Sequence, residues 1–105
     1  MKVRHQMGFR CKCPVDGKVD YYVASFYVRR LLKCEDIAQA VAALTREAAY
    51  QECLTQALAN RLDCKVKTVV RHRAGEGVIT TVVCRQAPGT SEVTHGPQAD
   101  GEAEG

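Results

Sequence analysis

The chain has 105 residues, of which 15 are Lys or Arg and 12 are Asp or Glu, for a net charge of +3. This length predicts one domain with a modest core, which favours further burial in a homo-oligomer. No run approaches the ~20 apolar residues that a membrane-spanning helix needs, and the charged, alternating start is unlike a signal peptide. We therefore expect a cytoplasmic protein with no membrane partner.

Apolar and polar side chains alternate along residues 3–13 and again along 20–28, which predicts two strands with one buried face. Asp16-Gly17 lies between them and is a strong hairpin signal, because both residues tolerate the positive φ of a type I′ turn. A two-residue turn there places Cys13 directly opposite Asp20. The same register pairs Cys11 with Tyr22, Phe9 with Ala24 and Met7 with Phe26.

Directly opposed side chains in a hairpin have Cβ atoms about 4.5–5.5 Å apart. The thiol of Cys13 and the carboxyl of Asp20 would then reach one substrate atom, as a nucleophile beside an acid/base. The alternative is a buried cysteine that only packs and an aspartate that only caps a turn.

Residues 35–62 contain no Gly or Pro, and their apolar positions recur at spacings of three and four. The apolar phase shifts near Thr45, a candidate N-cap, so we expect two helices with a break there. Alternation resumes over 64–72 and 78–84, with a turn at Ala74-Gly75-Glu76. The order strand–strand–helix–helix–strand–strand predicts an α+β domain over residues 1–86, with both helices on one face of the sheet.

Residues 87–105 carry four acidic side chains and no Lys or Arg, and they are rich in Gly, Pro, Ser and Thr. This composition predicts a disordered acidic tail. The preceding residues carry 15 basic and 8 acidic side chains, a charge of +7. A basic body of this kind fits a nucleic-acid or phosphate partner, and a solubilising surface is the equal alternative.

The six cysteines lie at positions 11, 13, 34, 53, 64 and 84. Without a secretory signal we expect reduced thiols. No Cys-x-x-Cys or His-x-x-His spacing occurs, so we expect no metal site. His5 and His72 fall on the inward faces of predicted strands, where partial burial accounts for them.

A specific resemblance lies in the run Cys13-Pro14-Val15-Asp16-Gly17-Lys18-Val19-Asp20-Tyr21. It is similar to the Cys-Pro-Val-Thr-Gly-x-Pro-Asp-Phe signature of QueF-type enzymes, the 7-cyano-7-deazaguanine reductases and their amidine-forming relatives. Tyr50-Gln51-Glu52-Cys53 resembles that family's Phe-His-Glu-Asp segment. The element order is that of the tunnelling fold (T-fold), whose domains form oligomeric barrels and bind purine-like rings at subunit interfaces. The resemblance thus implies a T-fold, ββααββ, in an oligomeric barrel.

The resemblance also implies roles for four residues. Cys13 would add to the nitrile carbon of 7-cyano-7-deazaguanine and form a covalent thioimide, and Asp20 would shuttle the proton to the nitrile nitrogen. Glu52 would bind the substrate by accepting hydrogen bonds from a ring N–H and the exocyclic amine of the base. Gln51 replaces the family's histidine and would keep a polar contact with the substrate.

The reductases carry a Glu-Ser-Lys-x-x-Lys-Tyr-like NADPH motif after the second strand, but residues 29–36 read Arg-Arg-Leu-Leu-Lys-Cys-Glu-Asp. A shorter branch of the family lacks that motif. It lets ammonia displace the cysteine and make an amidine on a base already within nucleic acid, as in archaeosine formation. The short chain and its basic body resemble this branch. We therefore expect an amidinotransferase-like enzyme that needs no cofactor and uses ammonia or another nitrogen donor.

The expected substrate is 7-cyano-7-deazaguanine, free or within tRNA or DNA. One alternative is an NADPH-dependent reductase in which Arg29, Arg30 and Lys33 hold the cofactor phosphates, and consumption of NADPH would identify it. A second is a non-catalytic T-fold module that binds a purine base or nucleic acid and tolerates loss of Cys13. A zinc enzyme similar to GTP cyclohydrolase is a distant further alternative, because its ligand cluster is not visible.

Overall fold

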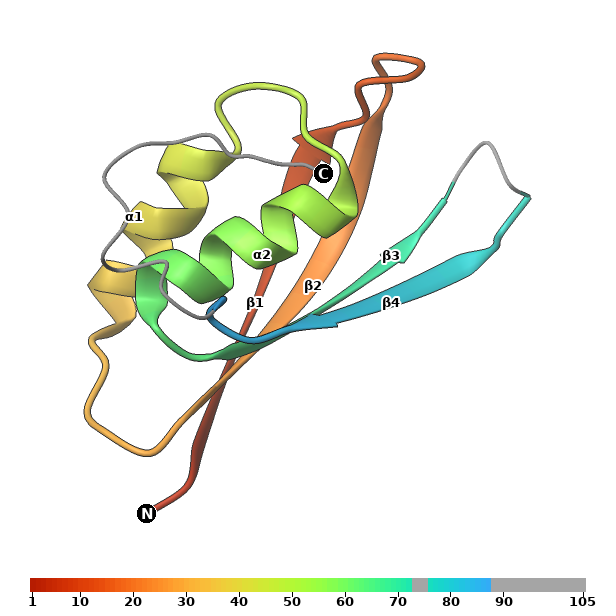
Figure 1. Cartoon of the computed structure of the whole chain (residues 1–105). Coiled ribbons are helices and arrows are strands. Elements are labelled where there is room, and N and C mark those ends of the chain that lie inside the picture. The colour runs from red at the N-terminus through yellow and green to blue at the C-terminus, as the bar shows by residue number, and fades with distance from the viewer. Residues whose placement is uncertain (73–75, 88–105) are drawn as a thin grey trace.

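Figure 1 shows a four-stranded sheet with two helices across it, in a computed structural model that describes residues 1–72 and 76–87. The elements are β1 (Val3–Lys12), β2 (Val19–Val28), α1 (Cys34–Leu44), α2 (Gln51–Leu62), β3 (Lys65–Arg71) and β4 (Ile79–Cys84). All neighbours are antiparallel, in the order β1-β2-β3-β4. The predicted α+β class and element order are confirmed.

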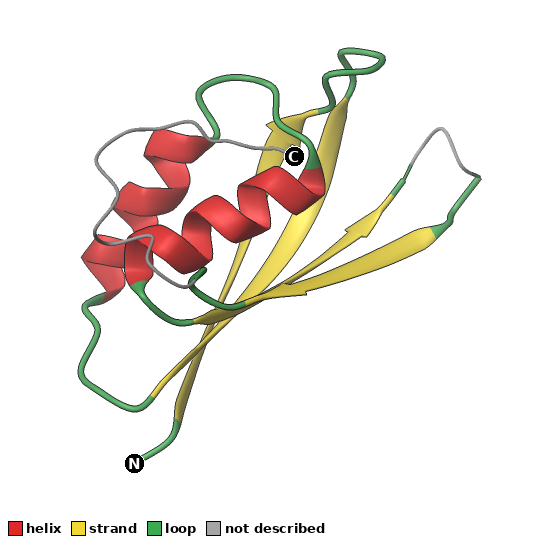
Figure 2. Cartoon of the chain, in the orientation of Figure 1, coloured by secondary structure: helices red, strands yellow, loops and turns green. Residues whose placement is uncertain are grey.

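Both helices lie over the same face of the sheet (Figure 2), and the core fills the space between these two layers. Every second residue of the strands points into it, as the alternation predicts. The helices supply apolar residues at spacings of three and four. Neither helix among the described residues is long and apolar enough to cross a membrane. The largest fully buried apolar side chains are Phe26, Leu54, Leu58, Val66 and Val70.

The register of the first hairpin differs from the prediction. Cys11 lies opposite Asp20, Phe9 opposite Tyr22 and Met7 opposite Ala24, so the pairing is shifted by two residues. A shift of two residues leaves every side chain on its original face, since the period of a strand is two. The apolar pattern was therefore satisfied equally by the predicted and the observed register.

The shift arises from a longer loop between β1 and β2. The Cys13 carbonyl accepts a hydrogen bond from Gly17 N–H at 2.9 Å, and Cys13 N–H donates to the Lys18 carbonyl at 2.8 Å. Asp16 Oδ1 accepts a bond from Lys18 N–H at 2.9 Å, and Gly17 has the positive φ of 73°. Pro14 lacks an N–H and cannot join the ladder, so residues 14–17 form the loop.

The helical region does break near Thr45, but Thr45 ends α1 and is not the N-cap of α2. Its Oγ1 and its N–H both donate to the Val41 carbonyl, at 2.8 and 3.0 Å. Helix α2 begins six residues later, at Gln51. The intervening segment is fixed to the end of β1 by a 3.1 Å bond from Ala49 N–H to the Lys12 carbonyl. That bond holds the start of α2 near the first hairpin.

The second hairpin keeps the predicted faces, with Val66 opposite Cys84, Thr68 opposite Val82 and Val70 opposite Thr80. The predicted turn residues Ala74 and Gly75 lie outside the described residues. The predicted acidic tail also lies outside them, except for Ala87, whose N–H donates to Asn60 Oδ1 at 3.1 Å.

Candidate active site

The predicted catalytic residues lie at the loop end of the first hairpin, beside the N-terminus of α2 (Figure 1). Cys13 is half-buried at the point where β1 gives way to the loop, and Asp20 is buried near the start of β2. Glu52 is exposed in the first turn of α2. Two strands and one helix end therefore supply the three side chains to one region.

Cys13 and Asp20 are diagonal neighbours across the hairpin, not directly opposed residues as predicted. The residue directly opposite Asp20 is Cys11, two positions earlier on the same face. Diagonal neighbours in an antiparallel pair lie about 7–8 Å apart, which leaves space for a substrate atom between thiol and carboxyl. That the two side chains act together on one substrate stays a prediction.

Tyr22 lies on the same face of β2 as Asp20, two positions further along the strand. Burial raises the pKa of its phenol, and the negative charges of Cys11, Asp20, Cys13 and Glu52 raise it further. The ring is 3% exposed and stacks on Phe9 with centroids 5.1 Å apart, so the hydroxyl stays in place and protonated.

Sequence reasoning treated Tyr22 as a core residue only. A signal for a further role was present, because a tyrosine on the inward face brings a hydroxyl that needs a partner when buried. Its position diagonal to Cys11 and two residues from Asp20 follows from the observed register, which the sequence pattern did not determine.

Cys11 and Cys13 differ in how accessible their thiols are. Cys11 is 3% exposed, and its Sγ lies 3.7 Å from the carbonyl oxygens of Lys12 and Glu47, to which the thiol can donate. Burial raises the pKa of the Cys11 thiol, which disfavours the reactive thiolate. Cys13 is half-buried and borders the loop. It is the thiol of this pair that a substrate can reach.

Gln51, predicted to contact the substrate, is 7% exposed and ties α2 to the sheet. Its amide nitrogen donates to the Thr68 carbonyl, to Thr68 Oγ1 and to the Thr80 carbonyl, at 3.0 to 3.2 Å. Thr55 Oγ1 donates to the Gln51 carbonyl at 2.7 Å and lies 2.6 Å from Thr68 Oγ1. A substrate contact for Gln51 stays a prediction. Because the amide nitrogen is already hydrogen-bonded, only the amide oxygen could make that contact.

Gln51→Ala should lower the free energy of unfolding by about 2 kcal/mol, because it leaves the buried carbonyl oxygen of Thr68 and the partly buried one of Thr80 without this donor. Urea unfolding measures the change. Glu52→Ala is the neighbouring exposed control and should stay within about 0.5 kcal/mol. A Gln51→Ala chain as stable as the parent would contradict the tethering role.

Stability should fall as the solution becomes alkaline. Burial raises the pKa of the thiols of Cys11, Cys64 and Cys84 and of the Tyr22 phenol. The folded chain therefore holds protons that the unfolded chain releases above the ordinary thiol pKa of about 8.5. The free energy of unfolding, measured with urea, should be constant below that pH and fall above it. In Tyr22→Phe it should fall less, because one of the raised pKa values is removed.

No metal site appears in the part of the chain that the structure describes. Over residues 1–72 and 76–87, no group of three or more His, Cys, Asp or Glu side chains is placed to hold a metal ion. His72 instead shares a 2.9 Å hydrogen bond with Thr80 Oγ1.

A search of solved structures finds the same fold in another protein. The chain resembles the crystal structure of the archaeosine synthase QueF-like in its apo form, with a TM-score of 0.62 and 20% sequence identity. The match covers 83% of this chain and 96% of that one. The chain therefore has the T-fold. No protein-family model and no curated protein sequence matches it.

Proposed function

We propose that the chain is an amidine-forming enzyme of the QueF type, acting on 7-cyano-7-deazaguanine within nucleic acid. The observation that supports this best is that Cys13 and Asp20 are diagonal neighbours on one face of the first hairpin, and that the bond from Ala49 to Lys12 holds the start of α2, with Glu52, near that hairpin. The same hairpin carries the QueF-like run, in a chain with the fold of an archaeosine synthase. Fold similarity alone would not carry the function, so the site residues are the stronger part of the argument.

In the proposed reaction the Cys13 thiolate attacks the nitrile carbon, a carbon–sulfur bond forms, and the triple bond becomes a C=N double bond. Asp20 passes the proton from the thiol to the nitrile nitrogen, which yields a neutral thioimide. Ammonia then adds to the same carbon, the carbon–sulfur bond breaks, and the thiol is restored. The sum is nitrile plus ammonia giving amidine, with no oxidant or reductant.

Glu52 would orient the base for this attack. Its carboxylate is exposed, so both oxygens are free to accept neighbouring N–H donors of a guanine-like ring. Its negative charge also helps to raise the pKa of the Tyr22 phenol and of the Cys84 thiol, in both cases adding to the larger effect of burial. We propose that a second copy of the chain completes the base pocket in a homo-oligomer.

The reductase alternative needs phosphate contacts from Arg29, Arg30 and Lys33. Arg30 is already engaged within the chain, since its guanidinium donates to the carbonyls of Leu62 and Asp63 at the end of α2. The amidine reaction needs no hydride donor and is the simpler fit to the side chains at the hairpin.

Intact-protein mass spectrometry tests the proposal. The purified chain is mixed with 7-cyano-7-deazaguanine, or with an oligonucleotide that carries this base. We expect a covalent adduct equal in mass to the added compound. An adduct that decays only when NADPH is supplied would support the reductase alternative. The absence of an adduct with either compound would support the non-catalytic binding module.

A further inference from the structure

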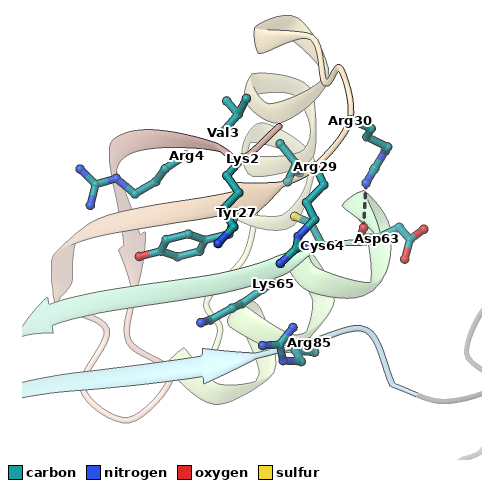
Figure 3. A pocket seen from close by; sticks show the side chains of 11 residues that line it. Lys2, Val3, Arg4, Tyr27, Arg29, Arg30, Asp63, Cys64, Lys65 and Arg85 are labelled. Atoms are coloured by element: carbon teal, nitrogen blue, oxygen red, sulfur yellow. Dashed lines mark hydrogen bonds between the residues drawn. The ribbon is translucent and has the colours of Figure 1, made fainter.

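A basic pocket of about 510 Å³ opens at the end of the sheet away from the candidate active site (Figure 3). It lies where β1 and β3 begin and where β2 and β4 end. Of the eleven residues that line it, one is acidic, Asp63. Six are basic, namely Lys2, Arg4, Arg29, Arg30, Lys65 and Arg85.

The charged ends of several of these side chains share one space. Figure 3 shows the side chains of Lys2, Arg29 and Lys65 extending into the pocket that Tyr27 also lines, while Arg30 turns to Asp63. Lys65 Nζ lies 5.1 Å from the centroid of the Tyr27 ring. Arg29, Lys65 and Lys2 are therefore directed to the pocket and not to the chain's own helix end.

The pKa of the Tyr27 phenol reflects the positive charge around it. Desolvation raises the pKa of its phenol, but the charge of Lys67, a hydrogen bond with Ser25 and the nearby Arg4 outweigh it, and the net pKa is lowered. A half-buried aromatic ring among Lys and Arg side chains is the combination by which proteins hold single-stranded nucleic acid, with bases stacked and phosphates paired.

We propose that this basic pocket binds a backbone phosphate of the nucleic-acid strand that carries the substrate base, which rests on the proposed function. Arg29 and Lys65 pair with the phosphate, and Tyr27 offers its ring to a neighbouring base. Arg30 is a positioning residue, because its bonds to Leu62 and Asp63 hold the end of α2 against the pocket.

A substrate that reaches both the basic pocket and the candidate active site has to be a polymer. Asp20 and Tyr27 lie seven residues apart on β2, which corresponds to roughly 23 Å at about 3.3 Å per residue, and their side chains point to opposite faces of the sheet. A single nucleotide cannot span that distance. A strand that contacts both sites has to pass around the end or edge of the sheet, so it spans several nucleotides. The pocket thus recognises the strand at a distance from the base that reacts.

Fluorescence anisotropy with a labelled single-stranded RNA, and with DNA of the same sequence, tests the proposal. The Arg29→Ala/Lys65→Ala chain should bind both about tenfold more weakly. The slope of log affinity against log salt should fall by about 0.7, because one phosphate contact is lost. Lys33→Ala removes an exposed charge that does not line the pocket and should retain full affinity.

Equal affinity of the double variant and the parent would overturn the proposal. So would an equal loss in Lys33→Ala, which would indicate diffuse charge, or competition by NADPH at lower concentration than by the oligonucleotide. Adduct formation with free 7-cyano-7-deazaguanine distinguishes failure of the pocket proposal from failure of the proposed function. The double variant should form that adduct at the parent rate, because the pocket does not contact the free base.

Discussion

Cys13→Ala should abolish the covalent adduct with 7-cyano-7-deazaguanine, while Cys11→Ala should keep it. Both variants remove one thiol from the same face of β1 and its extension, two residues apart. Cys13 is half-buried, whereas Cys11 is 3% exposed and lies against the carbonyls of Lys12 and Glu47. Only an accessible thiolate can attack the nitrile, so the loss in Cys13→Ala should be complete.

Intact-protein mass spectrometry after a fixed incubation measures both variants beside the parent chain. Far-ultraviolet circular dichroism shows that each is folded, since Cys11 is a core residue and its truncation costs some stability. An adduct in Cys13→Ala that disappears in Cys11→Ala would reverse the assignment. It would mean that the thiol directly opposite Asp20 is the nucleophile.

Asp20→Asn should slow adduct formation by about 10²- to 10⁴-fold, the usual contribution of a positioned acid or base. Asparagine keeps the shape of the side chain but cannot carry the proton from the thiol to the nitrile nitrogen. Asp20 is buried opposite Cys11. Because asparagine has nearly the same size and shape as aspartate, the fold should tolerate the change. The rate of mass gain over time measures the effect.

Asp16→Asn is the matched control for that variant. Asp16 is exposed, and its carboxylate only accepts a bond from Lys18 N–H within the loop, which an amide oxygen can also do. Its adduct should therefore form at the parent rate. Equal slowing in both variants would point to a general effect of negative charge at the hairpin and not to proton transfer by Asp20.

The sequence predicted the element order because each element has a clear periodicity. Alternation set the two faces of every strand, and the buried residues Phe26, Val66 and Val70 lie on the predicted inward side. The register of the first hairpin was not predictable in the same way. Two registers that differ by two residues bury the same face, and the loop decided between them.

The sequence suggested the members of the candidate site, whose roles stay predictions, and it did not determine their arrangement. The run from Cys13 to Asp20 marked the hairpin end, and Glu52 was named from its neighbours along the chain. The position of Tyr22 among these groups depends on long-range packing of α2 against the strands, which no local pattern encodes. Gln51 was read as a ligand contact, but its amide nitrogen is bound to Thr68 and Thr80 of the facing strands.

One measurement tests the central claim most directly. The chain that carries the adduct is separated from unreacted 7-cyano-7-deazaguanine and treated with isotopically labelled ammonium in the absence of NADPH. The released compound is then identified by mass spectrometry. Release of an amidine that contains one labelled nitrogen, with return of the chain to its original mass, is the predicted result. Release of unchanged nitrile, or an adduct that labelled ammonium leaves intact, would contradict amidine formation at this site.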